Sequence, residues 1–235
     1  MFNKIKYLLN MKKAKNTPST TEIKRSHHRW SNSPDQFQIE IDGESYEVKD
    51  ISYGGLQIFG KPINITSDVK LKFLFREIPV SLEEVYATDM SGGYRFIHND
   101  SNLLVFLRPI LENIRKGNTA QIIQTEFCKD PYNSEEWTII RAEGPIDISI
   151  NNIENTISYT YLSGKDYKNL KYVDNEIQIF SSIDEAGTSS RMEQNKGLNR
   201  QDAEQVIAQI QGIMHQLPKL EILEKFGKEL IGHIN

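Results

Sequence analysis

At 235 residues the chain is long enough for one and a half to two ordinary domains, and its composition, 38% hydrophobic and 26% charged, excludes a disordered or fibrous protein. No apolar run approaches the roughly 20 residues that span a bilayer, and the N-terminus lacks the apolar core of a secretory signal. The single cysteine, Cys128, excludes an intramolecular disulfide and indicates a reducing compartment, so we expect a cytoplasmic protein.

Charge is distributed unevenly about the net value of −4. Residues 1–34 carry eight basic side chains and one acidic, whereas residues 118–235 carry eleven basic and eighteen acidic. The basic front end suits an anionic ligand or surface, and the acidic back half argues against a protein that coats nucleic acid.

Residues 1–21 are predicted to be a basic N-terminal tail and linker. Within residues 1–16, apolar side chains share one helical side and lysines surround them, a pattern that can lie on an anionic membrane surface. The simpler alternative, which we favour, is an unstructured tail, or an upstream start codon with Met11 in place of Met1 as the true first residue.

The segment from Lys24 to Gly55 is predicted to form a basic loop followed by a β-hairpin. Apolar side chains alternate with polar ones on both sides of Asp42-Gly43, which is a typical type I′ turn (Phe37, Ile39 and Ile41 before it, Tyr46 and Val48 after it). The loop contains Arg25-Ser-His-His-Arg29, and the hairpin ends in Asp50-Ile-Ser52-Tyr-Gly-Gly55. These two motifs can converge on one small anionic ligand.

More short strands and a helix are expected after Gly55. Strand patterns cover Leu56–Ile58, Ile63–Ile65, Val69–Phe75, Pro79–Thr88 and Tyr94–Ile97, with turns predicted at Gly60-Lys-Pro62 and at Ser91-Gly92-Gly93. Residues 102–115 are amphipathic at helical spacing despite Pro109, and Lys116-Gly117 is expected to end this helix, with Gly117 as its C-cap.

The pattern R-x-x-x-R, about twenty residues, then [D/N]-x-S-x-x-G resembles the signature of the PilZ domain, a bacterial family that binds the second messenger cyclic di-GMP. The order of short strands and closing helix is also the PilZ layout, and Gly93-Tyr-Arg-Phe96 resembles the family's late Gly-x-x-Phe strand. The likeness covers about residues 22–117. It implies a small antiparallel β-barrel with a closing helix, within a mainly β member of the α+β class.

The resemblance implies that Arg25, Arg29, Asp50, Ser52 and Gly55 contact cyclic di-GMP. An Arg fork matches guanine O6 and N7 or a phosphate, and charge-assisted bonds of this kind are strong. Asp50 can accept from the guanine N1–H and N2–H₂ groups, Ser52 is a short donor and acceptor, and Gly55 lets the backbone approach a purine. Without a ligand, the arginines would be solvated cations and the Asp/Ser/Gly motif a simple turn.

Three further residues could join this site. Gly54 could also allow close backbone approach, and Lys24 would bring the local cations to three, which favours a stacked pair of ligands over one. Trp30 either stacks on a base or anchors the loop against the barrel, and we favour the anchor. Whether one or two ligands bind stays open.

The C-terminal half resembles no family that we recognise. Residues 118–182 contain several strand patterns and are predicted to form a second β-rich unit (Ala120–Glu126, Trp137–Ala142, Ile146–Ile150, Thr156–Leu162 and Ile177–Phe180). Residues 183–198 are predicted to be a flexible linker. Residues 199–235 are predicted to be helical, with Asn199 as N-cap, Asp202 as its partner and a break at Pro218.

An apolar stripe runs from Ala203 to Leu217 on the first of these helices. The stripe either packs on its own domain or meets another copy of the chain, and a homo-oligomer through it remains open.

No catalytic signature is present: the sequence has no P-loop, H-E-x-x-H, G-x-S-x-G or C-x-x-C, and no GGDEF-like or EAL-like motif of cyclic di-GMP turnover. We therefore expect a receptor that is not an enzyme and that needs no cofactor or metal. By the resemblance, it would relay cyclic di-GMP to an unidentified protein partner that controls motility, exopolysaccharide and biofilm, or virulence. The alternatives are a scaffold whose PilZ-like barrel binds no ligand and acts through its C-terminal helices, and a small barrel that binds single-stranded nucleic acid.

Overall fold

The computed structural model describes residues 28–31, 36–60, 69–97, 101–123, 137–183, 191–195 and 198–234. The tail 1–21, Lys24, Arg25, the Gly60–Pro62 turn with the strand after it, and Cys128 lie wholly or partly outside these ranges. None of the described helices is long and apolar enough to cross a membrane.

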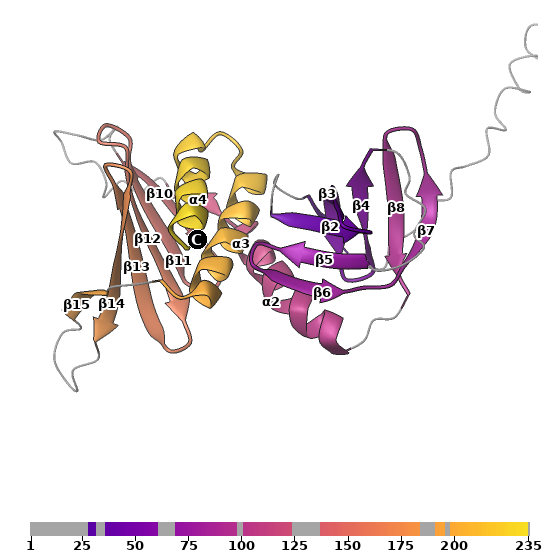
Figure 1. Ribbon diagram of the computed structural model, residues 1–235. Coiled ribbons are helices and arrows are strands. Elements are labelled where there is room, and N and C mark those ends of the chain that lie inside the picture. The colour runs from indigo at the N-terminus through magenta and orange to yellow at the C-terminus, as the bar shows by residue number, and fades with distance from the viewer. Residues whose placement is uncertain are drawn as a thin grey trace, which may run out of the picture.

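The first unit is an antiparallel sheet that curls into a half-barrel (Figure 1). Its strands are β1 (Trp30–Ser31), β2 (Phe37–Ile41), β3 (Glu44–Ser52), β4 (Gly55–Phe59), β5 (Val69–Phe73), β6 (Arg76–Pro79), β7 (Leu82–Ala87) and β8 (Ser91–Phe96). They pair in the order β6-β5-β2-β3-β4-β8-β7, and β1 pairs with β3. The two ends of this order, β6 and β7, are joined directly by Val80 and Ser81, so one bent stretch of chain links both edges of the sheet.

The predicted hairpin is confirmed. β2 and β3 pair from Ile41↔Glu44 to Gln38↔Glu47, and Asp42 and Gly43 have φ of 52° and 86°, as a type I′ turn requires. β3 then continues past its pairing with β2 and pairs with β4 instead, so it forms the corner at which the sheet curls.

The predicted turn at Ser91-Gly92-Gly93 is wrong, because these residues form the first half of β8. The glycines make room for aromatic rings. A Cβ on Gly93 would lie 2.1 Å from the ring of Tyr86, its partner on β7, and a Cβ on Gly92 would lie 2.7 Å from the hydroxyl of Tyr94. The strand expected over residues 79–88 corresponds to β7, although its first residue, Pro79, ends β6.

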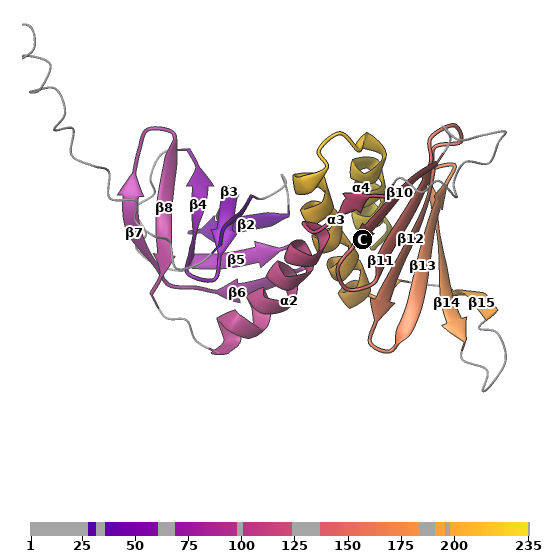
Figure 2. The same cartoon turned by 180° about the vertical axis from the view of Figure 1, so that it is seen from behind.

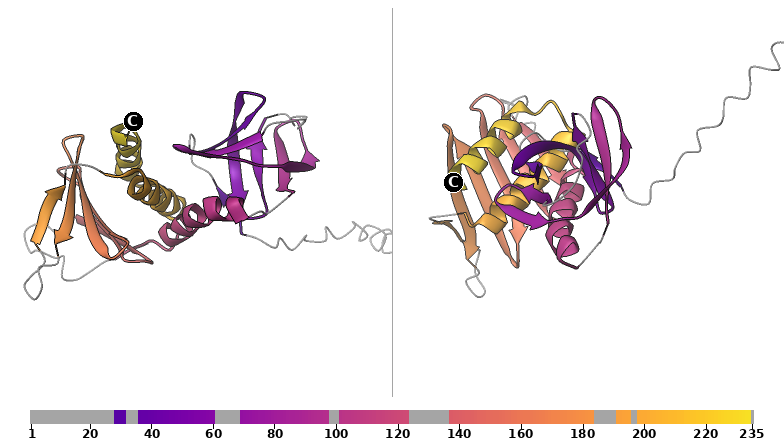
Figure 3. Two further views of the ribbon diagram at one scale, coloured as in Figure 1. Left: turned by 60° about the horizontal axis from the view of Figure 1, so that its bottom comes forward. Right: turned by 45° about the vertical axis from the view of Figure 1, so that its right-hand side comes forward.

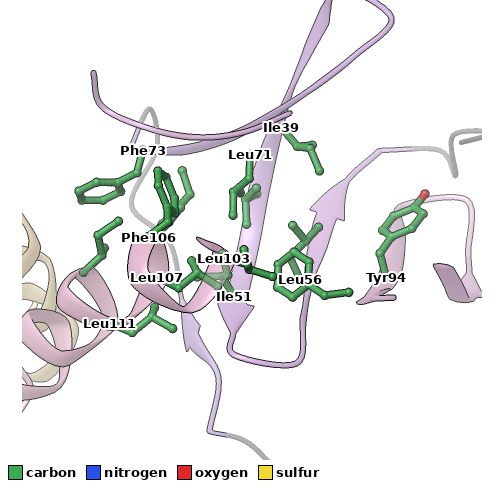
Figure 4. Close-up of a cluster of buried hydrophobic side chains, with 14 of the residues drawn as sticks. Ile39, Ile51, Leu56, Leu71, Phe73, Tyr94, Leu103, Phe106, Leu107 and Leu111 are labelled. Atoms are coloured by element: carbon green, nitrogen blue, oxygen red, sulfur yellow. The ribbon is translucent and has the colours of Figure 1, made fainter. Parts of the chain in front are cut away.

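Helix α2 (Ser101–Gly117) closes the half-barrel as expected. Its buried side chains include Leu103, Phe106 and Leu107, which Figure 4 shows among the strand residues Ile51, Leu56 and Leu71. The helix ends at Gly117, as predicted, but Gly117 does not have the positive φ of a left-handed glycine cap. It is buried, because the backbone of a second helix passes directly over it.

The second unit is a seven-stranded antiparallel sheet, and the mainly β fold class is thereby confirmed. Its order is β15-β14-β13-β12-β11-β10-β9, with β9 (Gln121–Ile122), β10 (Trp137–Ala142), β11 (Ile146–Asn151), β12 (Thr156–Ser163), β13 (Asp166–Val173), β14 (Glu176–Ile183) and β15 (Arg191–Asn195). The sequence did not indicate β13, whose lysines and asparagine hide the alternation of Leu170 and Tyr172. The predicted linker 183–198 contains β15, which pairs with β14.

Helices α3 (Arg200–Gln216) and α4 (Glu221–Ile234) cover the face of the second sheet that is turned toward the half-barrel (Figures 1 and 2). The predicted cap is confirmed, since Asn199 accepts a hydrogen bond from the Asp202 N–H at 2.8 Å. The apolar stripe of α3 is buried within the chain's own core, with Ala203, Val206, Ile207 and Ile213 at most 1% exposed. The stripe therefore packs within its own chain, which corrects the expectation that it could form an oligomer contact.

The two units meet where α2 crosses α3 (Figure 3). A Cβ on Gly117 would lie 2.0 Å from the carbonyl oxygen of Gln209, and a Cβ on Gly212 would lie 2.0 Å from that of Ile114. The helix backbones thus touch at a point that excludes any larger side chain. Gln209 of α3 links both units by hydrogen bonds. Its Nε2 donates to Asn113 of α2 and its Oε1 accepts from Tyr159 of β12, both at 3.0 Å.

We predict that Gly212→Ala will lower the free energy of unfolding by about 1–3 kcal/mol, because the new methyl group must push α2 away from α3. Gly232→Ala is the matched control. Gly232 lies in α4, and no atom lies within 4 Å of the position that its new methyl group would take, so this change should stabilise the protein by about 0.5–1 kcal/mol. Urea unfolding measures both, and a shift of the same sign for the two variants would contradict the crossing described here.

Candidate functional site

The short strand β1 brings the end of the basic loop onto the half-barrel. Trp30 pairs with Ile51 and Ser31 with Asp50, so the antiparallel register carries Arg29 toward Ser52 at the end of β3. Of the predicted site residues, Arg29, Asp50, Ser52, Gly54 and Gly55 are therefore brought together. Arg25 and Lys24 lie outside the described residues, and their ligand roles stay predictions.

A β-bulge aims Asp50 away from the core. Val48 pairs with Ile58, but the next pair is Asp50↔Gln57, so Lys49 is an extra residue in β3. The extra residue reverses the alternation, and both Val48 and Ile51 are fully buried. Asp50 is consequently left at the surface side of the strand, with its side chain 18% exposed.

Arg29 and Asp50 form an ion pair. Arg29 Nη1 donates to Asp50 Oδ1 at 2.5 Å, and the Arg29 side chain is 23% exposed. Within the described part of the chain Arg29 has no other hydrogen-bond partner, so most of its five N–H donors can serve a ligand. The carboxylate holds the guanidinium over the sheet, and the pair presents donors and acceptors side by side.

Ser52 and Gly55 have structural reasons for their identities. The Ser52 hydroxyl is buried, donates to Gly55 O at 3.1 Å and accepts from the Gly54 N–H at 3.3 Å, which closes the two-residue turn between β3 and β4. A Cβ on Gly55 would lie 2.1 Å from the carbonyl oxygen of Tyr94, so only glycine fits between β4 and β8. The structural roles of Ser52 and Gly55 therefore do not depend on a ligand, and their ligand contacts stay predictions.

Trp30 is buried, as the anchor role that we favoured requires. Its side chain is 8% exposed and belongs to the core of the half-barrel. The exposed His28 lies against it, with ring centroids 4.1 Å apart. No group of three or more acidic, His or Cys side chains that could hold a metal occurs among the described residues.

Two residues near the site were not indicated by the sequence. Tyr53 stands at the tip of the β3–β4 turn, where burial, with a smaller contribution from Glu112 of α2, raises the pKa of its phenol. Gln211 of α3 is buried, and its Nε2 donates to the backbone carbonyl of Ser31 at 3.0 Å. Its Oε1 is buried and has no hydrogen-bond partner among the described residues. The contact spans 180 positions, so no local pattern could have indicated it.

Comparison with known proteins adds little. No family model and no curated protein matches the sequence. Among solved structures, an uncharacterized Legionella protein is similar with a TM-score of 0.32 and 20% identity, over 37% of this chain and 94% of that one. The PlzA protein of Borreliella burgdorferi, solved in complex with c-di-GMP, gives a TM-score of 0.24 and 10% identity, over 73% of this chain and 81% of that one. At such low scores neither likeness supports an argument.

We predict that Ser52→Ala will cost about 1–3 kcal/mol of folding stability, because it leaves the Gly54 N–H and Gly55 carbonyl groups without their shared partner. Ser45→Ala is the control, since the exposed Ser45 hydroxyl bonds Gln38 at the surface and its loss should change stability by less than about 0.5 kcal/mol. Equal effects in urea unfolding would argue against the turn-closing role.

Proposed function

We propose that this chain is a receptor for cyclic di-GMP that performs no catalysis. The observation that carries the proposal is the Arg29–Asp50 pair beside the Ser52–Gly55 turn, because these residues of the PilZ-like motif lie together on one side of the half-barrel. The likeness of the motif supplies the identity of the ligand, and the geometry supports a site of the right chemistry.

In this proposal Arg29 and Asp50 bind different groups of the ligand. The remaining N–H donors of Arg29 bind a phosphate or the O6 and N7 edge of guanine, and Arg25 provides the second guanidinium. Asp50 accepts from the guanine N1–H and N2–H₂ groups with the oxygen that Arg29 does not use. The existing ion pair orients both groups before the ligand arrives, which lowers the entropy cost of binding.

Gln211 gives ligand binding a route to the second unit. Ser31, whose carbonyl it holds, is separated from Arg29 by Trp30 alone. A ligand that draws the Arg25–Arg29 loop onto the half-barrel would strain the hydrogen bond between Gln211 and the Ser31 carbonyl. The strain would displace α3. The second sheet and its helices would then present the altered state to a protein partner, with motility, exopolysaccharide synthesis and virulence as the outputs expected from the resemblance.

One observation favours the alternative, a scaffold with a half-barrel that binds no nucleotide. Arg29 is already neutralised by Asp50, and the Ser52 hydroxyl is engaged in its own turn. A site with its polar groups paired internally is also what a ligand-free structural unit would show. Titration of the intact protein with cyclic di-GMP separates the two functions, because the scaffold predicts no binding heat at any concentration.

We predict that Arg29→Ala and Arg25→Ala will each weaken cyclic di-GMP binding by about 2–4 kcal/mol, since each removes a charge-assisted contact from a partly buried site. Arg141→Ala is the control, because Arg141 pairs with Asp147 on the second sheet and should leave affinity unchanged. Calorimetry measures affinity and the number of ligands per chain, and Lys24→Ala should lose the second ligand first if two bind. Unchanged affinity in either loop variant would show that the site is elsewhere.

We predict that Gln211→Leu will uncouple the second unit from the ligand. In the parent protein, cyclic di-GMP should alter amide hydrogen exchange along α3, and the variant should lose this change while its affinity falls less than about tenfold. Gln216→Leu, at an exposed position of the same helix, is the matched control. If exchange in α3 responds equally in all three proteins, Gln211 is not the route.

A further inference from the structure

A second pocket lies away from the Arg29–Asp50 site, where the two units meet. It has a volume of about 520 Å³, which is within the usual range for small-molecule sites. Its walls come from the β5–β6 turn, from α2 and from the first two turns of α3 (Phe75, Arg76, Pro109, Ile110, Asn113, Arg200, Gln201, Glu204 and Gln205). None of the described residues among the predicted cyclic di-GMP contacts (Arg29, Asp50, Ser52, Gly54 and Gly55) lines it.

The described charged side chains that line the pocket, Arg76, Arg200 and Glu204, carry a net charge of +1, in a protein whose net charge is −4. Arg76 contacts Glu204 through one long interaction of 3.4 Å, and Arg200 forms no ion pair or hydrogen bond with any described residue. Among the described residues, Glu204 is the single carboxylate of the lining, and it is largely buried. Burial raises the pKa of Glu204 in spite of the opposing attraction of Arg76 and Arg200. The exposed Arg200 guanidinium, which has no ion-pair partner among the described residues, is therefore available to an external anion.

The same arginines lie over aromatic rings. The Arg200 guanidinium lies 5.4 Å from the ring centroid of Phe75, and that of Arg76 lies 4.9 Å from Phe106. Cation–π attraction of this kind keeps each guanidinium close to the apolar wall. Phe75, Pro109 and Ile110 add apolar wall. A ligand that uses both kinds of surface needs a flat apolar body and an acidic group.

The N-terminus of α3 does not itself supply the anion site. The Asp202 N–H of its first turn already donates to the capping residue Asn199, and the Asp202 carboxylate pairs with Lys168 of β13. The positive character of the pocket therefore comes from side chains of both units, Arg76 on β6 and Arg200 on α3.

From these features we infer that the pocket binds a small organic anion, one acidic group on a flat apolar body, at the junction of the two units. The acidic group pairs with Arg200 and with the Arg76 edge that Glu204 holds weakly, and the flat body lies against Phe75, Pro109 and Ile110. Such a ligand contacts α2 and α3 together and so stabilises their arrangement. This site would make the protein responsive to a second ligand, whether or not the first site binds cyclic di-GMP.

Two fluorescent probes that share a ring system test the inference on the full chain. 8-Anilinonaphthalene-1-sulfonate carries the acidic group, and N-phenyl-1-naphthylamine lacks it. The sulfonate should bind one site per chain, and the neutral amine at least tenfold more weakly. Arg200→Gln should weaken the sulfonate about tenfold, the loss expected for one charge-assisted contact, whereas Glu204→Gln should tighten it by removing the competing carboxylate.

Arg141→Gln is the control for a general loss of positive charge, because Arg141 lies on the second sheet with Asp147 as its partner. Its sulfonate affinity should equal that of the parent protein, and addition of cyclic di-GMP should not displace the probe from the site. The inference is overturned if both probes bind equally, if the sulfonate does not bind, or if Arg200→Gln behaves as Arg141→Gln does. Weaker binding to Glu204→Gln, in a variant whose unfolding curve is unchanged, would also overturn it.

Discussion

The contact between the α2 and α3 backbones is the constraint on which the rest of the structure depends. Gly117 and Gly212 lie at the crossing, and each faces a carbonyl oxygen of the other helix at a distance that no Cβ could occupy. Because the two backbones touch, α3 lies within reach of both hydrophobic cores. Ala208 belongs to the core of the half-barrel, whereas Val206 and Ile210 belong to that of the second sheet. Residues 206–213 of α3 are all buried, so the two units are joined by shared core rather than by a linker.

Local chemistry explains the parts of the fold that the sequence predicts well. The type I′ turn at Asp42-Gly43 fixes the register of the β2–β3 hairpin, and the Asn199 cap fixes the start of α3, since both depend on neighbouring residues alone. The misread parts depend on distant partners. Gly93 looks like part of a turn until Tyr86, from the neighbouring strand β7, is seen to fill the space above it. One overlooked signal was local: buried Val48 and Ile51 are three residues apart, which a regular strand cannot accommodate and a bulge can.

The candidate site shows the same division between local and distant information. Arg29, Asp50 and Ser52 come together because one hairpin and one added strand position them, so their spacing in sequence was informative. The reasons for Ser52 and Gly55 nevertheless proved to be structural, since one closes a turn and the other admits the β8 backbone. Gln211 could not be predicted at all, because a polar residue within an apolar helical stripe gives no indication of the distant carbonyl that it binds.

Helix α3 links the two candidate sites physically. Arg200 and Glu204 in its first turns line the pocket between the units, and Gln211 near its end holds the strand that follows Arg29. Glu204 and Gln211 are about 10 Å apart along the helix axis, at 1.5 Å per residue. A helix whose middle is buried on all sides moves as a rigid body, so a displacement near one end is transmitted to the other. If the affinity of each site depends on where α3 lies, thermodynamic linkage requires the coupling to be reciprocal. An anion in the pocket must then change the affinity for cyclic di-GMP by the same factor with which cyclic di-GMP changes the affinity for the anion.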